Sequence, residues 1–211
     1  MKDSIKIVFQ GDSITDAGRE KRDYHHMGNG YPHYVAESLI SCFPNVAFEF
    51  INQGISGNRS GQLFDRLYTD AIAFEPDIIS VLIGVNDVWH RHERNVIRTT
   101  DEQFEANLRA ILSTLREHTS AKILLLQPYL LDGEETAHLR PELDRIIAIV
   151  NRLADEYADA YVRLDEMFAE AMKTQPEPCY YSRDGVHPVS KASALIAEHY
   201  LEAVKPLIES L

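Results

Sequence analysis

The stretch that decides the fold is residues 5–15, IKIVFQGDSIT. It begins with a mostly apolar run of β-favouring side chains, as expected of a fully buried strand. Gly11 ends this strand, and short polar side chains follow at Asp12, Ser13 and Thr15. Because α/β enzymes place reacting groups at the carboxyl end of the sheet, Ser13 is a candidate nucleophile. The alternative is that Asp12 or Ser13 only caps the next helix or closes a turn.

Strands and helices alternate along the rest of the chain. Apolar periodicity and Gly/Pro punctuation predict further strands at 47–51, 78–83, 122–126 and 160–164. They predict helices at 31–43, 62–74, 101–118, 141–157, 166–173 and 190–207, and loops at 84–95 and 128–139.

This alternation favours a parallel sheet with helices on both faces and right-handed connections. The predicted fold is a three-layer α/β/α sandwich with a five-stranded parallel sheet in the flavodoxin-like order 2-1-3-4-5. In that order the first and third strands flank the switch point of the sheet. Ser13 and residues 84–87 are therefore expected to face one crevice.

Composition indicates an ordinary globular protein, with residues 1–211 forming one domain. The chain is 45% hydrophobic and 26% charged, and its formal net charge of -12 argues against nucleic acid as a partner. Residues 1–9 carry no hydrophobic region of a signal peptide, and no apolar run reaches membrane-spanning length. We therefore expect a cytoplasmic location without membrane association. Cys42 falls in an apolar helical pattern and is expected in the core.

His187 is the best candidate for the base that a serine nucleophile needs. Asp184 lies three residues before it in DGVHP, where Gly185 and Pro188 indicate a shaped turn. Such a turn can bring an aspartate and a histidine together, with Asp184 orienting His187 as general base and acid. The alternative is that Asp184 and Ser190 only organise a turn and cap the last helix.

Acyl transfer also needs hydrogen-bond donors where negative charge develops on the former carbonyl oxygen. Gly57 can offer a backbone N–H with no side chain in the way, and Asn86 a side-chain amide. The backbone N–H of Ser13 is a third candidate. Taken singly, Gly57 is typical of a turn and Asn86 of an Asx turn. Their occurrence after separate strands, where one site can collect them, favours a joint catalytic role.

Four segments together resemble the SGNH (GDSL) hydrolases: GDSIT at 11–15, GISGN at 54–58, GVND at 84–87 and DGVH at 184–187. They occur in the order of that family and span nearly the whole chain. The resemblance implies a Ser-His-Asp esterase with Ser13 as nucleophile, His187 as base and Asp184 as its partner. It also implies an oxyanion hole made by the N–H groups of Ser13 and Gly57 and the side chain of Asn86. The flavodoxin-like sheet agrees with this resemblance.

Longer matches are similar to the acetyl xylan esterase branch, which removes acetyl groups from plant-sugar hydroxyls. They are GDSITDAGR at 11–19, GNGY at 28–31, NQGISGN at 52–58 and IGVNDVW at 83–89. That branch often has an aromatic residue just before the catalytic Asp, where this chain has Ser182-Arg183.

The expected substrate is a small-molecule or oligosaccharide ester with a short, mainly acetyl, acyl group, since no long apolar insertion resembles a lid for a fatty chain. Asp12 is expected to organise its turn and, with Tyr31 and Trp89, to line the substrate site. Tyr129 is a further aromatic ring beside a sheet-edge loop, and packing beneath a loop is the alternative for each ring. The alternative functions are a lysophospholipase or thioesterase for longer acyl chains and a non-catalytic carbohydrate-binding or assembly module.

No cofactor or metal is expected. The pairs His25-His26 and His90-x-His92 lack the spacing of a ligand set, and solvated loops explain them better. A homo-oligomer is possible, with Met27, Leu130 and Leu131 at an interface or, alternatively, buried under their own loops.

Overall fold

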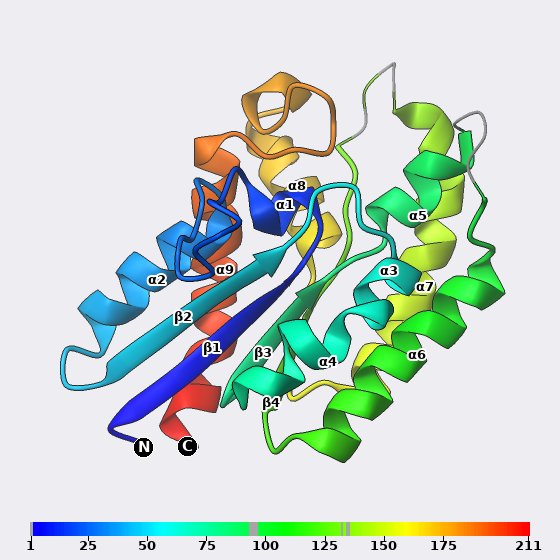
Figure 1. Ribbon diagram of the computed structural model, residues 1–211. Coiled ribbons are helices and arrows are strands. Elements are labelled where there is room, and N and C mark those ends of the chain that lie inside the picture. The colour runs from blue at the N-terminus through cyan, green and yellow to red at the C-terminus, as the bar shows by residue number, and fades with distance from the viewer. Residues whose placement is uncertain (1, 93–96, 132, 134–135) are drawn as a thin grey trace.

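A five-stranded parallel sheet forms the centre of the molecule, as a computed structural model of residues 2–92, 97–131, 133 and 136–211 shows (Figure 1). The strands are β1 (Ser4–Gly11), β2 (Ala47–Gly54), β3 (Ile78–Leu82), β4 (Lys122–Leu126) and β5 (Ala160–Val162). Their order is β2-β1-β3-β4-β5, and every neighbouring pair is parallel. The predicted fold class and strand order are both confirmed.

Helices cover both faces of the sheet (Figure 1). On one face α2 (Tyr31–Cys42) packs against α9 (Ser190–Glu209), which also contacts β4 and β5. The other face carries α3 (Ser60–Asp65), α4 (Leu67–Asp70), α6 (Asp101–His118) and α7 (Arg140–Tyr157). The remaining helical segments are α1 (Ser13–Asp16), α5 (Val85–Trp89), α8 (Leu164–Thr174) and the 3-10 turns η1 (Ile72–Phe74), η2 (His90–His92), η3 (Ala137–Leu139) and η4 (Pro178–Tyr180).

The local sequence explains these elements. All five residues of β3 are buried, as expected of a central parallel strand with helices on both sides. Helix α6 begins with a capping box, in which Thr100 accepts a hydrogen bond from the Gln103 N–H and the Gln103 side chain accepts one from the Thr100 N–H. Its apolar residues, at helical spacing, are buried against the sheet and α7.

Two local predictions are wrong. The helix expected at 62–74 is broken at Arg66 and Ala71 into α3, α4 and η1, and the break at Arg66 lets its side chain turn inward. The loop expected at 84–95 contains α5 and η2, while its residues 93–95 lie outside the described residues. Residues 132, 134 and 135 of the loop expected at 128–139 also lie outside them.

Cys42 is exposed rather than in the core. Helix α2 ends at this residue, and the buried stripe of the helix continues from Leu39 to the half-buried Phe43, four residues on. Met27, Leu130 and Leu131, by contrast, are buried, so of the two alternatives for these residues burial within their own chain is correct.

The carboxyl ends of the strands lie at one edge of the sheet, where several loops gather (Figure 1). In the register of the sheet, Gly11 pairs with Gly54 of β2 and with Leu82 of β3. The segments that follow these three residues therefore start side by side. None of the helices that the described residues form is long and apolar enough to cross a membrane.

Candidate active site

Ser13 is the first residue of α1, directly beyond the end of β1. Asp12 precedes it as the N-cap, and the Asp12 side chain accepts a hydrogen bond from the Ile14 N–H at 3.0 Å. Close packing requires the glycine before this turn, because a Cβ on Gly11 would lie 2.2 Å from Thr15 Oγ1 and 2.7 Å from the Leu82 carbonyl oxygen. The capping role considered for Asp12 is thus confirmed, and it leaves the half-buried Ser13 side chain free to meet other groups.

Ser13, His187 and Asp184 form an unbroken chain of hydrogen bonds. Ser13 Oγ lies 2.8 Å from His187 Nε2, and His187 Nδ1 lies 2.6 Å from Asp184 Oδ2. A carboxylate only accepts, so Nδ1 carries the proton and Nε2 presents its lone pair to the Ser13 hydroxyl. This arrangement can remove the Ser13 proton and hold the resulting imidazolium against a negative charge.

The loop that carries Asp184 and His187 is tightly shaped. Asp184 Oδ1 accepts hydrogen bonds from Ser182 Oγ and from the N–H groups of Val186 and His187. An antiparallel bridge between Ser182 and Pro188 closes the loop. The alternative role in capping α9 is not what the structure shows, because the N-cap is Val189 and has no side-chain cap bond.

The loop after β4 holds the segment 184–187 in place through two hydrogen bonds. Tyr129 Oη donates a 2.8 Å hydrogen bond to the Val186 carbonyl, and the Leu131 N–H donates one of 2.8 Å to the Gly185 carbonyl. Gly185 has a φ of 80°, which an L side chain rarely adopts, and a Cβ there would lie 2.8 Å from the Leu131 carbonyl oxygen. His187 is therefore presented from a fixed backbone, although half of its side chain is exposed.

Asp184 is set to remain ionised. Partial burial opposes its charge, but hydrogen bonds from the His187 side chain and from the His187 and Val186 N–H groups prevail and lower its pKa to about 2. The Asp184 carboxylate is thus ionised, and available as the partner of His187, at neutral pH.

Gly57 lies in the loop between β2 and α3 with a φ of 80°. A Cβ there would meet nothing within 4 Å, so the backbone conformation and not crowding requires the glycine. The loop is held to β1 by the Ile55 N–H, which donates to the Gly11 carbonyl at 3.1 Å. On its other side, Ser56 donates from both N–H and Oγ to Asp16 Oδ2.

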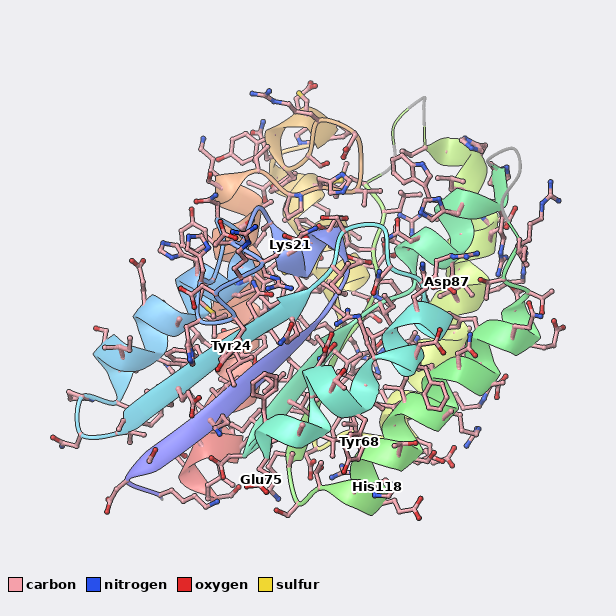
Figure 2. All side chains as sticks on the ribbon, in the orientation of Figure 1. Lys21, Tyr24, Tyr68, Glu75, Asp87 and His118 are labelled. Atoms are coloured by element: carbon pink, nitrogen blue, oxygen red, sulfur yellow. The ribbon has the colours of Figure 1, made fainter. Side chains whose placement is uncertain are left out.

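Asn86, on α5, is connected to the same loop. Its Nδ2 donates a 3.1 Å hydrogen bond to the carbonyl of Asn58, the residue after Gly57. The neighbouring Asp87, labelled in Figure 2, accepts bonds from Ser60 N–H at 2.9 Å and Ser60 Oγ at 2.7 Å, and burial raises the pKa of its carboxyl despite these bonds. The structure thus joins the Gly57 loop to the Asn86 helix.

Not every residue predicted to line the site does so. Tyr31 is fully buried in the core, with Oη 3.2 Å from Thr15 Oγ1, and Tyr129 is equally buried under the Val186 segment. The predicted substrate contact is wrong for Tyr31, and the alternative of packing inward is correct for both rings, because α2 and the loop after β4 turn them into the core. Asp12 is also fully buried, so its predicted substrate contact is wrong, while its part in the turn is confirmed. Trp89, at the end of α5, is half-buried.

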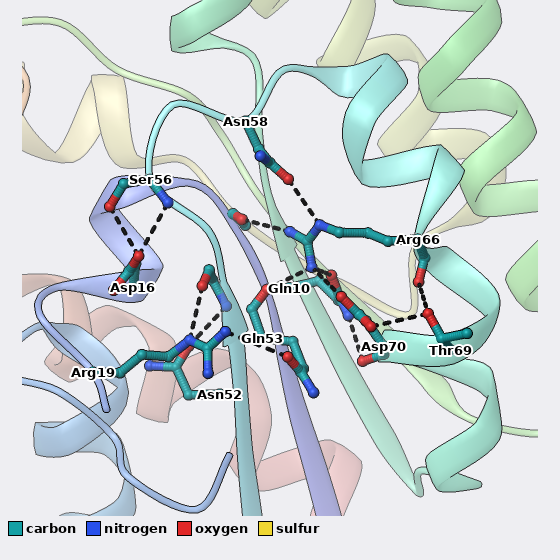
Figure 3. A network of polar contacts seen from close by, with 12 residues as sticks. Gln10, Asp16, Arg19, Asn52, Gln53, Ser56, Asn58, Arg66, Thr69 and Asp70 are labelled. Atoms are coloured by element: carbon teal, nitrogen blue, oxygen red, sulfur yellow. Dashed lines mark hydrogen bonds and ion pairs between the residues drawn. The ribbon is translucent and has the colours of Figure 1, made fainter. Parts of the chain in front are cut away.

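Sequence reasoning missed the polar residues that hold these loops together, above all Arg66 and Asn58 (Figure 3). The spacing of Arg66 and Asp70 is typical of an ion pair on a solvated helix face. A signal for Asn58 was its place in the segment GISGN at 54–58, whereas Arg66 is one of three charged residues in the segment 62–74 and nothing local distinguishes it.

Within the described part of the chain, no group of three or more His, Cys, Asp and Glu side chains is arranged to hold a metal ion. His92 instead lies 3.0 Å from Glu142, which also pairs with Arg91.

The buried carboxyl of Asp12 is expected to make the stability of the protein depend on pH. Burial raises the pKa of its carboxyl from 3.8 to about 7 despite the bond from Ile14, and Asp12 Oδ2 has no hydrogen-bond partner among the described residues. The folded protein therefore holds this proton more tightly than the unfolded chain does, so its free energy of unfolding should fall as pH rises from about 4 to about 7. The decrease expected from Asp12 is about 4 kcal/mol.

Asp12→Asn should remove this pH dependence while keeping an acceptor for Ile14. The measurement is urea unfolding of both proteins across this pH range. A difference in unfolding free energy between them that stays constant with pH would contradict the assignment.

Comparisons with known proteins agree with this geometry. Residues 9–195 match the GDSL-like Lipase/Acylhydrolase family. An acetylxylan esterase of Geobacillus stearothermophilus is 31% identical over 206 residues, which cover 94% of this chain and 93% of the relative. The crystal structure of Axe2, an acetylxylan esterase from the same organism, is similar with a TM-score of 0.88 at 30% identity and 97% coverage of both chains. An arylesterase of Vibrio mimicus is 25% identical over 203 residues, 92% of this chain and 86% of the relative.

The match to the family extends over most of the chain and includes the carboxyl-end loops of the sheet that carry Ser13, Gly57, Asn86 and the 184–187 segment. The fold, the described geometry of these loops and the esterase relatives all agree with membership of this family. This chain belongs to the GDSL-like lipase/acylhydrolase family and is a carboxylic ester hydrolase.

Proposed function

We propose that the protein removes short acyl groups, mainly acetyl, from the hydroxyls of xylan-type or other sugars through an acyl-enzyme on Ser13. The observation that carries the proposal is the unbroken hydrogen-bond chain from Ser13 Oγ through His187 to Asp184. A serine hydroxyl is a weak nucleophile until a base takes its proton, and this chain supplies the base in the tautomer that can do so.

The first half of the reaction acylates Ser13. His187 Nε2 accepts the hydroxyl proton as Ser13 Oγ forms a bond to the ester carbonyl carbon, and the carbonyl oxygen becomes an oxyanion. The imidazolium then donates that proton to the sugar oxygen as the carbon–oxygen bond breaks. The sugar leaves as an alcohol, and the acyl group stays on Ser13.

The second half releases the acid. His187 takes a proton from a water molecule whose oxygen attacks the acyl carbon, and the proton then returns to Ser13 Oγ as the acyl–serine bond breaks. Asp184 stays ionised throughout and stabilises the imidazolium.

The oxyanion is assigned to the N–H groups of Ser13 and Gly57 and to Asn86 Nδ2. In support, Gly57 is exposed, with open space where a side chain would begin, and one bond from Asn86 Nδ2 to the Asn58 carbonyl orients the amide. Preorganised donors of this kind contribute more to acyl transfer than any other single factor in many enzymes.

The accessibility of the site supports a sugar ester. Half of the His187 side chain is exposed, so the reacting groups lie at the surface, where an acetyl group projecting from an oligosaccharide can reach them. Among the described residues, the half-buried ring of Trp89 is the candidate for stacking on a sugar. Arg183 is exposed beside Asp184 and, with Ser182, lines a cavity of about 380 Å³ next to the candidate site.

An ester panel tests the substrate class. We expect kcat/KM for p-nitrophenyl acetate to exceed that for the octanoate by at least about tenfold, because no described segment offers a long apolar channel. Acetylated xylo-oligosaccharides should release acetate, and EDTA should leave the rate unchanged. A preference for octanoate would replace this proposal with a lysophospholipase or thioesterase activity, and absence of turnover on every ester would favour a binding module.

A further inference from the structure

We propose that Arg66 is the positioning residue that holds the oxyanion-hole donors in place. The inference rests on the proposed function, because it assigns a role to Arg66 through Ser13, Gly57 and Asn86. These donors lie after β1, β2 and β3. Along the chain, each is separated from the next by at least one helix and one strand. Something must fix their relative positions, and the side chain of Arg66 contacts all these loops directly or through one residue.

The guanidinium group of Arg66 lies at the carboxyl ends of β1 and β2 (Figure 3). Nη2 donates a 2.9 Å hydrogen bond to the carbonyl of Gly11, two residues before Ser13. Nη1 donates one of 2.7 Å to the carbonyl of Gln53, at the start of the segment that leads to Gly57. Arg66 therefore ties the β1 turn to the β2 loop.

The third link runs through Asn58. Arg66 Nε donates a 2.8 Å hydrogen bond to Asn58 Oδ1, and the carbonyl of this same residue accepts the 3.1 Å bond from Asn86 Nδ2. Asn58 and Asn86 are both only 8% exposed, so little water competes for these bonds. The bond to Asn58 uses one amide hydrogen of Asn86 and aims the other away from it, as an oxyanion donor requires.

The position of the guanidinium is itself fixed. Its side chain is 13% exposed, and Nη1 also contacts Asp70 Oδ2 and Gln10 Oε1, each at 3.0 Å. Gln10 in turn donates to the carbonyl of Asp70 at 2.6 Å. A surface ion pair would need only the contact with Asp70. Arg66 has four further acceptors, on Gln10, Gly11, Gln53 and Asn58. Those on Gly11, Gln53 and Asn58 belong to candidate catalytic segments, as a positioning role predicts.

Only arginine can make this set of bonds. Its planar fork presents donors in fixed directions, whereas the single ammonium of lysine cannot reach Gly11, Gln53 and Asn58 together. Arg66→Lys keeps the charge beside Asp70 and removes the fork. A displacement of the donors by about 1 Å is expected to lower kcat about 100-fold, because the donors act on the transition state more than on bound substrate. KM should change by less than about threefold for the same reason.

The experiment measures kcat and KM on p-nitrophenyl acetate for Arg66→Lys and Asn58→Ala, with Arg109→Lys as the matched control. Arg109 is an arginine on the surface of α6 that pairs with Glu156. Asn58→Ala removes the third link alone and should lower kcat about tenfold. It also keeps the test valid if Arg66→Lys does not fold. Arg109→Lys should match the wild type.

Amide NMR separates this inference from the proposed function. The Gly57 N–H and the Asn86 side-chain resonances should shift in Arg66→Lys and Asn58→Ala, while those of β4 and α6 should not. Unchanged Gly57 and Asn86 resonances, or kcat within about twofold of the wild type in both variants, would overturn the positioning role. Failure of the wild type to hydrolyse any ester would instead refute the proposed function, and the resonances would still report whether Arg66 holds the loops.

Discussion

Replacing Ser13 by alanine is expected to lower kcat for acetate-ester hydrolysis by a factor of about 10⁶, as removal of a serine nucleophile does in other hydrolases. The substitution removes the atom placed to attack the ester carbonyl, 2.8 Å from the base His187. Residual hydrolysis would come from the oxyanion donors and substrate binding alone. The measurement is steady-state hydrolysis of p-nitrophenyl acetate, with enzyme concentration raised to detect slow turnover.

Stability distinguishes this effect from unfolding. Among the described residues, Ser13 Oγ forms its one hydrogen bond with His187, so the free energy of unfolding should change by less than about 0.5 kcal/mol. Ser113→Ala is the matched control, since Ser113 lies on α6 and its Oγ bonds to the Ala110 carbonyl of the same helix. It should keep full activity. If Ser13→Ala retained more than about a tenth of the wild-type rate, Ser13 would not be the nucleophile.

Replacing Asp184 by asparagine is the second large effect, with an expected fall in kcat of about 10⁴. In the wild type, Oδ2 accepts the Nδ1–H of His187 at 2.6 Å. An amide nitrogen at that position would donate instead, so the imidazole would turn its proton toward Ser13 and lose the lone pair that removes the hydroxyl proton. The negative charge that stabilises the imidazolium would also be lost.

The loop should survive the Asp184→Asn substitution, because the amide oxygen of the new side chain can still accept the bonds from Ser182, Val186 and His187. The wild-type carboxyl has a pKa of about 2, below its ordinary value of 3.8, so its stabilising contribution is present above about pH 4 and is lost as pH falls through 2. The variant should accordingly remain slow from pH 5 to pH 8, by about the same factor throughout. Asp155→Asn, an exposed change on α7, is the control, and a loss of less than about tenfold in Asp184→Asn would contradict the orienting role.

The strands followed from local features, whereas their order was the flavodoxin-like order that alternating strands and helices favour. Residues 5–10 and 78–82 are nearly continuous apolar runs bounded by Gly, Pro or Asp, and such runs need two covered faces, which only a parallel sheet with helices on both sides supplies. The break at Arg66 was not predictable in the same way. Helical periodicity continues through it, and the interruption depends on acceptors that belong to β1 and β2.

The candidate reacting side chains were also predictable, because a hydroxyl, an imidazole and a carboxylate after strand ends or in a Gly-Pro turn leave a chemical signature in the sequence. Burial was not. Tyr31 stands at the start of an amphipathic helix, and nothing within residues 28–31 distinguishes a ring that faces a sugar from one that packs on Phe9 and Tyr200. That outcome depends on α9, more than 150 residues away along the chain.

The sequence by itself determined the strands and the identity of Ser13, Asp184 and His187 as the candidate reacting groups, because apolar pattern and side-chain chemistry are local properties. The order of the strands was expected by analogy with flavodoxin-like sheets. Only the tertiary structure decided that Asp12 and Tyr31 are buried and that Arg66 binds the ends of two strands. The physical reason is that two of the acceptors of Arg66 are backbone carbonyls, at Gly11 and Gln53. Every residue carries such a carbonyl, so only the fold determines which ones meet a guanidinium.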